Sequence, residues 1–249
     1  MQRIAPWHTG ELLAFDLETT GVDRFGDVPV SFALVRMLDG RVVARESSLV
    51  DPCRPIPSPA TEVHGITDER ARREGMALVD AVAHVADTLV DASHRGTPVV
   101  GMKLDFDLTM VDACLRRHSG VGLADAGFAG PVLDVLVLDR HFDRFRSGRR
   151  TLGDLCTHYG VVIEHAHDAV VDAEATLAVM AAMCRRFPEL VAATAEDLHW
   201  SQMDWHRDWA DSFAQWQQGT GLLTLEPCDR EWPIAGARAD LMEVVRAAG

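Results

Sequence analysis

Short apolar runs separated by turn residues mark the first fifty positions of the chain. Residues 11–18, 28–38 and 41–50 are rich in β-branched and other apolar side chains, a composition typical of strands. The dipeptide Asp39-Gly40 lies between the second and third runs and is a strong signal for a two-residue hairpin turn. The pattern therefore predicts three consecutive strands, which we expect to form an antiparallel meander.

The middle of the chain alternates between helical and strand periodicity. Four prolines among residues 51–59 predict an extended loop, because proline has no backbone N–H and restricts the residue before it. Beyond this loop, apolar stripes at helical spacing alternate with short apolar runs. The predicted elements are a helix over 76–90, a strand over 97–101, a helix over 105–117, a strand over 132–137, a short helix over 151–159 and a helix over 169–187. The order of elements is β-β-β-α-β-α-β-α.

A long helix is predicted near the C-terminus, over residues 195–217. Its apolar face carries five large side chains, Leu198, Trp205, Trp209, Phe213 and Trp216. Aromatic rings stack on unpaired nucleic-acid bases, but a stripe at helical spacing also packs on a protein core. Of these two roles, we expect packing.

The composition is that of a globular protein. The 249 residues are 47% hydrophobic and 25% charged, and no apolar run approaches the roughly 18 residues of a membrane span. The first six residues lack the apolar core of a secretion signal. The five cysteines are scattered and form no C-x-x-C pair, which argues against a disulfide framework and a zinc site. We therefore expect a cytoplasmic protein with reduced thiols and no membrane partner.

The formal net charge of −14 argues against non-specific coating of nucleic acid, which requires an excess of Lys and Arg. It does not exclude an enzyme that grips a single strand end. One local cluster of cations opposes the overall charge, and within its span only Asp143 is acidic: Arg140, Arg144, Arg146, Arg149 and Arg150. This cluster either steers a polyanion or forms a solvated helix end and loop.

Two carboxylates stand where the first predicted strand ends. Strand side chains alternate with period 2, so Asp16 and Glu18 project from the same face. Like charges side by side are costly unless a cation lies between them, and carboxylate oxygens suit Mg²⁺ and Mn²⁺. Alone, such a pair is more often a solvated strand end, here before a Thr-Thr-Gly turn.

Three segments together resemble a known family. Residues 15–21 (Phe-Asp-Leu-Glu-Thr-Thr-Gly) resemble the first motif of the DEDD 3′→5′ exonucleases, a group that includes the proofreading subunit of bacterial DNA polymerase III. Residues 100–108 resemble the second motif, in which an acid follows Phe at a helix start. This assigns Asp107, and we expect Asp105 to cap the helix. Residues 167–173 resemble the third motif, where His167 and Asp172 have four residues between them. The histidine indicates the His-type branch (DEDDh).

The resemblance implies an α/β protein with the RNase H-like fold, a mixed five-stranded sheet flanked by helices. It covers residues 8–188, the expected exonuclease domain. Residues 189–249 are then a Trp-rich helical C-terminal extension, similar to the tail of actinobacterial exonuclease-domain proteins. His165 and His167 form a His-x-His pair, but no third soft ligand lies nearby, so we do not expect a transition-metal site.

The resemblance also implies a catalytic set. Its metal ligands fall on Asp16, Glu18, Asp107 and Asp172, which would hold two Mg²⁺ or Mn²⁺ ions. His167 would act as the general base, because imidazole ionises close to working pH.

Four candidate substrate contacts accompany this set: Thr19, Thr20, His64 and Lys103. His64 belongs to a His-Gly-Ile turn that lies beside the substrate cleft in the family, although a histidine that caps a turn explains it equally well. The chain departs from many relatives at Met102-Lys103, where they carry His-Asn. Lys103 either reaches a phosphate or is solvated.

The expected function is removal of nucleoside 5′-monophosphates from the 3′ end of nucleic acid, with DNA favoured. The alternatives are an exoribonuclease of the same family, a non-catalytic module that binds nucleic acid or a polymerase, and a metal-binding structural protein. The expected partners are 3′ ends of single-stranded DNA or RNA, and a DNA polymerase or repair complex.

Overall fold

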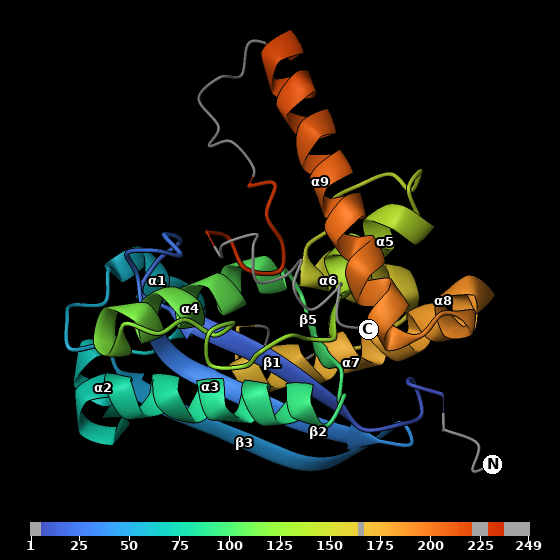
Figure 1. Ribbon diagram of the computed structural model, residues 1–249. Coiled ribbons are helices and arrows are strands. Elements are labelled where there is room, and N and C mark those ends of the chain that lie inside the picture. Colours follow the sequence, from blue (N-terminus) through green and yellow to red (C-terminus); the bar gives the residue numbers. More distant parts are fainter. Residues whose placement is uncertain (1–5, 164–166, 221–228, 237–249) are drawn as a thin grey trace.

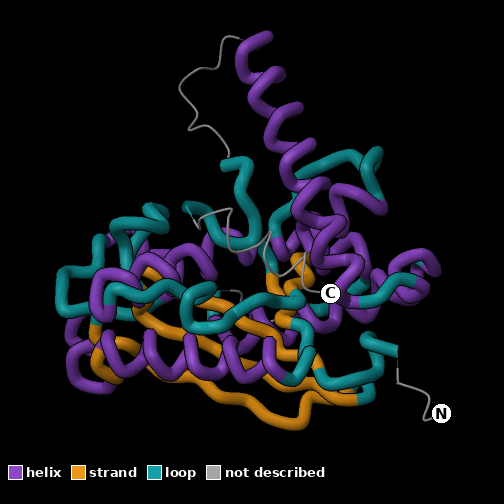
Figure 2. Tube along the Cα trace, viewed as in Figure 1, coloured by secondary structure: helices purple, strands orange, loops and turns teal. Residues whose placement is uncertain are grey.

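A mixed six-stranded sheet is the centre of the computed structural model, which describes residues 6–163, 167–220 and 229–236. The strand order is β4-β3-β2-β1-β5-β6 (Figures 1 and 2). The strands are β1 Leu12–Thr19, β2 Pro29–Leu38, β3 Arg41–Asp51, β4 Met76–Ala77, β5 Val99–Gly101 and β6 Val132–Asp134.

The predicted meander is confirmed. Strands β1, β2 and β3 pair in sequence as antiparallel neighbours. Asp39 and Gly40 both have positive φ angles, 51° and 71°, as the hairpin turn between β2 and β3 requires. Strands β5 and β6 continue the sheet parallel to β1. The predicted α/β architecture is therefore correct.

Three expected element boundaries are wrong. The sheet has a sixth strand because Met76 and Ala77 pair with the end of β3 before the helix begins. The proline-rich loop ends at Pro57, since a helix accepts proline in its first turn, where that N–H needs no partner. The strand expected over 132–137 ends at Asp134, whose carboxylate accepts the Leu136 N–H and starts a helix.

Helices cover both faces of the sheet. They are α1 Ser58–His64, α2 Asp68–Glu74, α3 Leu78–His94, α4 Leu104–Ser119, α5 Val135–Phe142, α6 Leu152–Tyr159, α7 Ala169–Arg186, α8 Pro188–Ala192 and α9 Ala195–Thr220. The side chains of β1 alternate between two hydrophobic cores, one on each face of the sheet. Leu13 and Phe15 pack with α3 and α4, whereas Leu12 and Ala14 pack with α7 on the opposite face. Because Asp16 and Glu18 share the parity of Leu12 and Ala14, they belong to the α7 face.

The long helix α9 is tied to the edge of the sheet by polar contacts as well as by apolar packing. Strand β6 is an edge strand, so part of its backbone has no strand partner. His199 Nδ1 accepts the Val132 N–H at 3.2 Å, and Gln202 Oε1 accepts the Asp134 N–H at 2.8 Å. Gln202 also donates to the Val132 carbonyl at 2.9 Å. These buried side chains of α9 therefore complete the edge of the sheet.

The expected packing of the Trp-bearing face is correct for only part of α9. Leu198 is buried, and Trp205 stacks on His141 with ring centroids 3.7 Å apart. Further along the helix, Trp216 is 50% exposed. The outer end of α9 projects away from the sheet (Figure 1). The boundary at residue 188 stays a prediction. In the described part of the chain, no helix is long and apolar enough to cross a membrane.

Candidate active site

Asp16 and Glu18 lie in the second half of β1, which has a strand neighbour on each side. Their partners in β2 are Ala33 and Ser31. The register shifts between Glu18 and Thr19, so the strand becomes irregular directly after the second acid. Pairing with β2 fixes the backbone under the two carboxylates, which supports a site that needs defined geometry, whereas β5 pairs only with the earlier residues Leu13 and Ala14.

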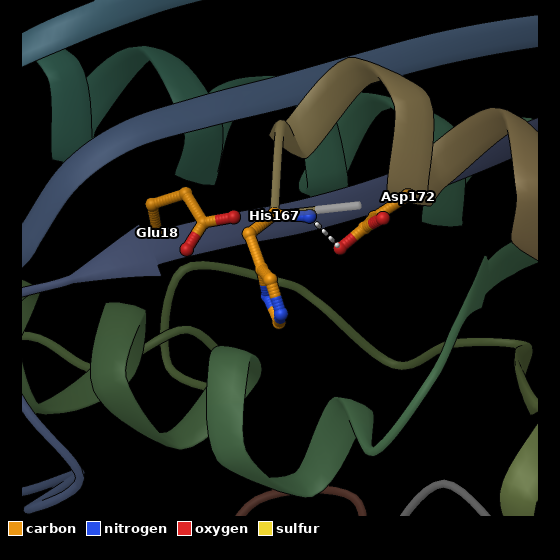
Figure 3. Close-up of side chains that lie close together, drawn as sticks. All are labelled: Glu18, His167 and Asp172. Atoms are coloured by element: carbon orange, nitrogen blue, oxygen red, sulfur yellow. Dashed lines mark hydrogen bonds between the residues drawn. The ribbon is translucent and has the colours of Figure 1, made fainter. Parts of the chain in front are cut away.

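Asp172 reaches the same place from α7. Asp168 is the N-cap of this helix, and its carboxylate accepts the N–H groups of Val170 and Val171 at 3.0 and 3.3 Å. The cap starts the helix so that Asp172, in its first turn, faces β1. Asp172 Oδ2 also accepts the backbone N–H of His167 at 3.3 Å (Figure 3).

Glu18, His167 and Asp172 form a compact group. Each offers a ligand atom, and these atoms all lie within 4.8 Å of one another. In Figure 3, His167 lies between the other two residues. Its φ angle of 72° is in the left-handed region, which a non-glycine residue adopts only when its surroundings stabilise it. His165, the other half of the His-x-His pair, lies outside the described residues.

Asp107 completes the acid set from the first turns of α4, where it is 5% exposed. Its charge is the largest contribution after burial to the raised pKa of Asp16, so the two carboxylates interact. Asp107 is therefore the member of the set contributed from the α4 side, and the structure brings all four predicted acids together.

The start of α4 is held by a residue that sequence reasoning missed. The Asp134 carboxylate accepts the N–H groups of Lys103 and Leu104 at 3.1 and 2.8 Å. The expectation that Asp105 caps this helix is wrong, since Asp105 instead accepts from Arg24 at 3.2 Å. An Asp where an apolar run meets a helix is an N-cap signal, but the overlong strand predicted over 132–137 concealed it.

Burial and mutual repulsion raise the pKa values of the acids in the cluster. Burial raises the pKa of Asp16, and the charges of Asp107, Asp172 and Glu18 raise it further. Burial, followed by Asp172 and Asp168, raises the pKa of Glu18 to about 7. The pKa values of Asp107 and Asp172 are also raised, chiefly by burial. Four such acids are stable as anions only when positive charge lies among them.

The donor set fits hard divalent cations. Its carboxylate oxygens are the ligands that Mg²⁺ and Mn²⁺ prefer. Asp172 Oδ1 is buried without a hydrogen-bond partner, and such an atom is costly unless something binds it. Asp16, Glu18, Asp107 and Asp172 are thus the residues suited to hold metal, and the identity of the ion stays a proposal.

Two predicted substrate contacts take part in local structure. The Thr20 hydroxyl is 2% exposed, donates to Asp27 Oδ1 at 2.7 Å and accepts the Val28 N–H at 3.2 Å. Thr19 Oγ1 donates to the Gly21 carbonyl at 2.7 Å. These bonds shape the turn after β1. The structure therefore favours a scaffolding role for both hydroxyls.

The other two candidates lie beside the acids. His64 Nδ1 accepts the Ile66 N–H at 3.0 Å, so the histidine does close a turn. Burial lowers its pKa, and the Thr19 backbone and His167 also influence it. Its Nε2 is buried with no partner within hydrogen-bonding distance, although Thr19 is close. Lys103 is exposed, and its charge lowers the pKa of Asp107.

The arginine cluster is divided. Arg146 and Arg150 both bind the carboxylate of Asp139, which is fully buried. Arg144 and Arg149 are exposed. Two of the five arginines neutralise a buried acid. The structure therefore does not support steering of a polyanion by all five as one set.

We expect divalent cations to stabilise the protein more at pH 8 than at pH 5.5. The raised carboxyl pKa values mean that the folded state binds protons more tightly than the unfolded state. Stability without metal therefore rises as pH falls through these values, and protons then compete with the cation. At pH 8, an Mn²⁺ concentration a hundredfold above Kd should add about 2.7 kcal/mol, or roughly 5–10 °C in Tm.

Melting curves at both pH values, with EDTA or Mn²⁺, measure this effect. Glu69→Gln, which removes an exposed acid of α2, is the control and should keep the full shift. An Asp16→Asn variant that responds to Mn²⁺ as strongly as wild type would show that the ion binds elsewhere.

Comparison with known proteins agrees with this arrangement. Residues 13–180 match the family model described as Exonuclease. The DNA polymerase III PolC-type protein of Lacticaseibacillus paracasei is 33% identical over 168 residues, which are 68% of this chain and 11% of that protein. The PolC-type protein of Pediococcus pentosaceus is 29% identical over 171 residues, with 69% and 11% covered. The chain thus spans about a tenth of the length of these relatives.

Solved structures share the fold. Exonuclease I from Methylocaldum szegediense superposes with a TM-score of 0.60 at 24% identity, covering 73% of this chain and 42% of that one. E. coli exonuclease I in complex with a dT13 oligonucleotide gives 0.61 at 23% identity, with the same coverage. The region that matches the family model, residues 13–180, contains all four predicted metal ligands. The solved structures share the fold that carries them. The chain belongs to the exonuclease family, of the DEDD type.

Proposed function

We propose that the protein is a 3′→5′ exonuclease that hydrolyses DNA with the help of two divalent cations. The observation that carries this proposal is the convergence of four carboxylates from three separate elements, β1, α4 and α7, next to the exposed side chain of His167. Acids held together at such electrostatic cost have no structural purpose in a pure binding module. Their arrangement supports catalysis over the non-catalytic alternative.

The acids would supply the site's charge. Asp16, Glu18, Asp107 and Asp172 would hold the cations, with Asp16 most central because each of the other three raises its pKa. When bound, two such ions stabilise the attacking and leaving oxygens of an in-line displacement at phosphorus. The backbone bond from His167 to Asp172 couples the loop bearing the histidine to the metal-binding acid.

His167 would take the proton from the attacking water. Attack forms a new P–O bond and breaks the bond between phosphorus and the 3′ oxygen of the preceding nucleotide. That oxygen gains a proton, and a nucleoside 5′-monophosphate is released. The exposed ring can reach solvent and substrate, because only its backbone is held by Asp172. His64 lies beside the Thr19 backbone and would shape the pocket for the terminal nucleotide, and Lys103 would offer its charge to a phosphate.

The names of the relatives favour DNA over RNA. The PolC-type proteins are DNA polymerases, and several of the exonuclease I structures hold deoxyoligonucleotides. The same relatives make a polymerase or repair complex the proposed partner. The proposed compartment is the cytoplasm.

Product analysis tests the proposal. Single-stranded DNA and RNA of the same sequence, each with Mg²⁺ or Mn²⁺, should yield nucleoside 5′-monophosphates, with DNA degraded faster. Chromatography of the products against 5′- and 3′-monophosphate standards identifies them. Release of 3′-monophosphates, or of long internal fragments, would contradict the proposed chemistry. Faster degradation of RNA would select the exoribonuclease alternative.

A further inference from the structure

A groove lies between α5, the loop that follows it, and α9. Its volume is about 870 Å³. One wall carries the arginines Arg140, Arg144 and Arg150, and the other carries the aromatic rings of Trp205, Trp209 and Phe213. None of these residues belongs to the acid cluster, and the proposed chemistry does not use them.

The aromatic wall continues into a ladder along the outer half of α9. Trp209 and Phe213 stack with centroids 5.3 Å apart and an interplanar angle of 14°. Phe213 and Trp216 stack at 5.6 Å and 25°. Trp216 is 50% exposed, so the outer end of the ladder is open to solvent. The three rings cover one another's faces, so the ring that offers an open face to an unpaired base is Trp216 at the end of the ladder.

The arginine wall faces this ladder directly. The Arg140 guanidinium lies 3.4 Å from the centroid of the Trp209 ring. Arg144 is exposed and lies 5.8 Å from the ring centroid of Phe145, which is 93% exposed. Arg144 also contributes, after burial, to a lowered pKa of His141, so its charge acts within the groove. Arg140 therefore covers the inner end of the ladder, whereas Arg144 and the exposed ring of Phe145 match a ligand with both phosphates and planar bases.

The groove holds charges of both signs. Arg150 is bound to the buried Asp139, so it serves the fold as well as the wall. Two acids line the groove: Asp211 pairs with Arg230 at 2.9 Å, and Asp208 is exposed on α9. The exposed cation of Arg144 is therefore a positive site on a chain whose net charge is −14.

The groove also lies at the end of the sheet that carries the acid cluster. Strands β1, β5 and β6 are parallel, so their C-terminal ends meet at one edge. Asp16 and Glu18 are near that end of β1, and α5 starts directly after β6 at the same edge. Helix α9 packs on both β6 and α5 (Figure 1). A strand whose 3′ end enters the acid cluster can continue along this edge towards α9.

We propose that this arginine–aromatic groove binds the unpaired nucleotides of a single-stranded nucleic acid. A base would stack on Trp216 at the open end of the ladder, and Arg144 would contact the backbone phosphates. The placement of the 3′ end rests on the proposed function, whereas binding in the groove needs no hydrolysis. The groove therefore adds affinity for single strands that extend beyond the terminal nucleotide.

Binding without catalysis tests this directly. Fluorescence anisotropy of labelled dT20 is measured in EDTA with wild type, the double variant Phe213→Ala/Trp216→Ala, and Arg144→Glu. Loss of Trp216 and of Phe213, the ring that supports it, should weaken binding by roughly 10-fold, and Arg144→Glu should weaken it and reduce its salt dependence. Trp200→Ala and Arg207→Glu are matched controls, since both residues lie on α9 but line a different cavity, and they should bind within twofold of wild type.

A second measurement separates the groove from the chemistry. With Mn²⁺, both groove variants should hydrolyse a dinucleotide at the wild-type rate but lose kcat/KM on dT20. Absence of any hydrolysis together with weakened dT20 binding would overturn the proposed function and leave the groove supported. Groove variants that bind dT20 as tightly as wild type would overturn the groove. So would sedimentation showing that wild type self-associates and the double variant does not, since the surface would then join two copies of the chain.

Discussion

Replacement of Asp16 by Asn should lower nuclease turnover on the order of 10³-fold, since a bound ion contributes several kcal/mol to transition-state stabilisation. Asp16 is the acid whose pKa is raised by Asp107, Asp172 and Glu18 together, so no other residue is as central to the cluster. Asn has nearly the same shape but carries no charge. The loss would therefore report on the charge and leave the packing of β1 intact.

The same substitution should stabilise the metal-free protein at pH 8. The raised pKa of Asp16 means that its ionised form opposes folding at that pH, and Asn removes the charge. Single-turnover rates with Mn²⁺ and melting curves in EDTA measure the two effects. Asp105→Asn is the control, because Asp105 lies in the first turn of α4 beside the proposed ligand Asp107 but pairs with Arg24, and it should cost less than tenfold in rate. A loss as large as that of Asp16→Asn would mean that Asp105, and not Asp107, is the acid of the second motif.

Replacement of His167 by Ala should reduce turnover roughly 10²- to 10⁴-fold, the usual contribution of a positioned general base. The Mn²⁺-induced rise in Tm should stay close to that of wild type, because the four carboxylates remain. This second measurement is needed, since a ring nitrogen of His167 lies within 4.8 Å of ligand atoms of Glu18 and Asp172. A strongly reduced Tm shift would instead make His167 a metal ligand.

His165→Ala is the natural control for His167→Ala. It removes the same ring two residues earlier, outside the spacing of the third motif. We expect it to be nearly neutral. If His165→Ala abolished turnover and His167→Ala did not, the third motif would be out of register by two residues.

The parts of the site that sequence reasoning located are governed by local rules. Strand alternation placed Asp16 and Glu18 on one face, and the structure puts that face against α7. The spacing from His167 to Asp172 placed the acid in the first turn of a helix, where the Asp168 cap holds it. Each of these inferences needs information from only a few neighbouring residues.

The parts that were missed depend on residues distant in sequence. Asp134 holds the start of α4 from about thirty residues away, and no periodicity encodes that contact. Buried Asp139 binds two of the five clustered arginines, so local composition overstated the available positive charge. The contacts of polar side chains of α9 with the edge strand β6 were also not predicted, because only the apolar stripe of this helix was interpreted.

The polarity of degradation tests the central claim most directly. One single-stranded DNA is prepared with a bulky block on the 3′ hydroxyl, and a matched strand carries the same block on the 5′ end. With Mg²⁺ or Mn²⁺, the 5′-blocked strand should be degraded at the rate of the unblocked strand, and the 3′-blocked strand should be strongly protected. Excess EDTA should stop both reactions. Equal protection by the two blocks, or undiminished degradation in EDTA, would contradict a metal-dependent 3′→5′ exonuclease.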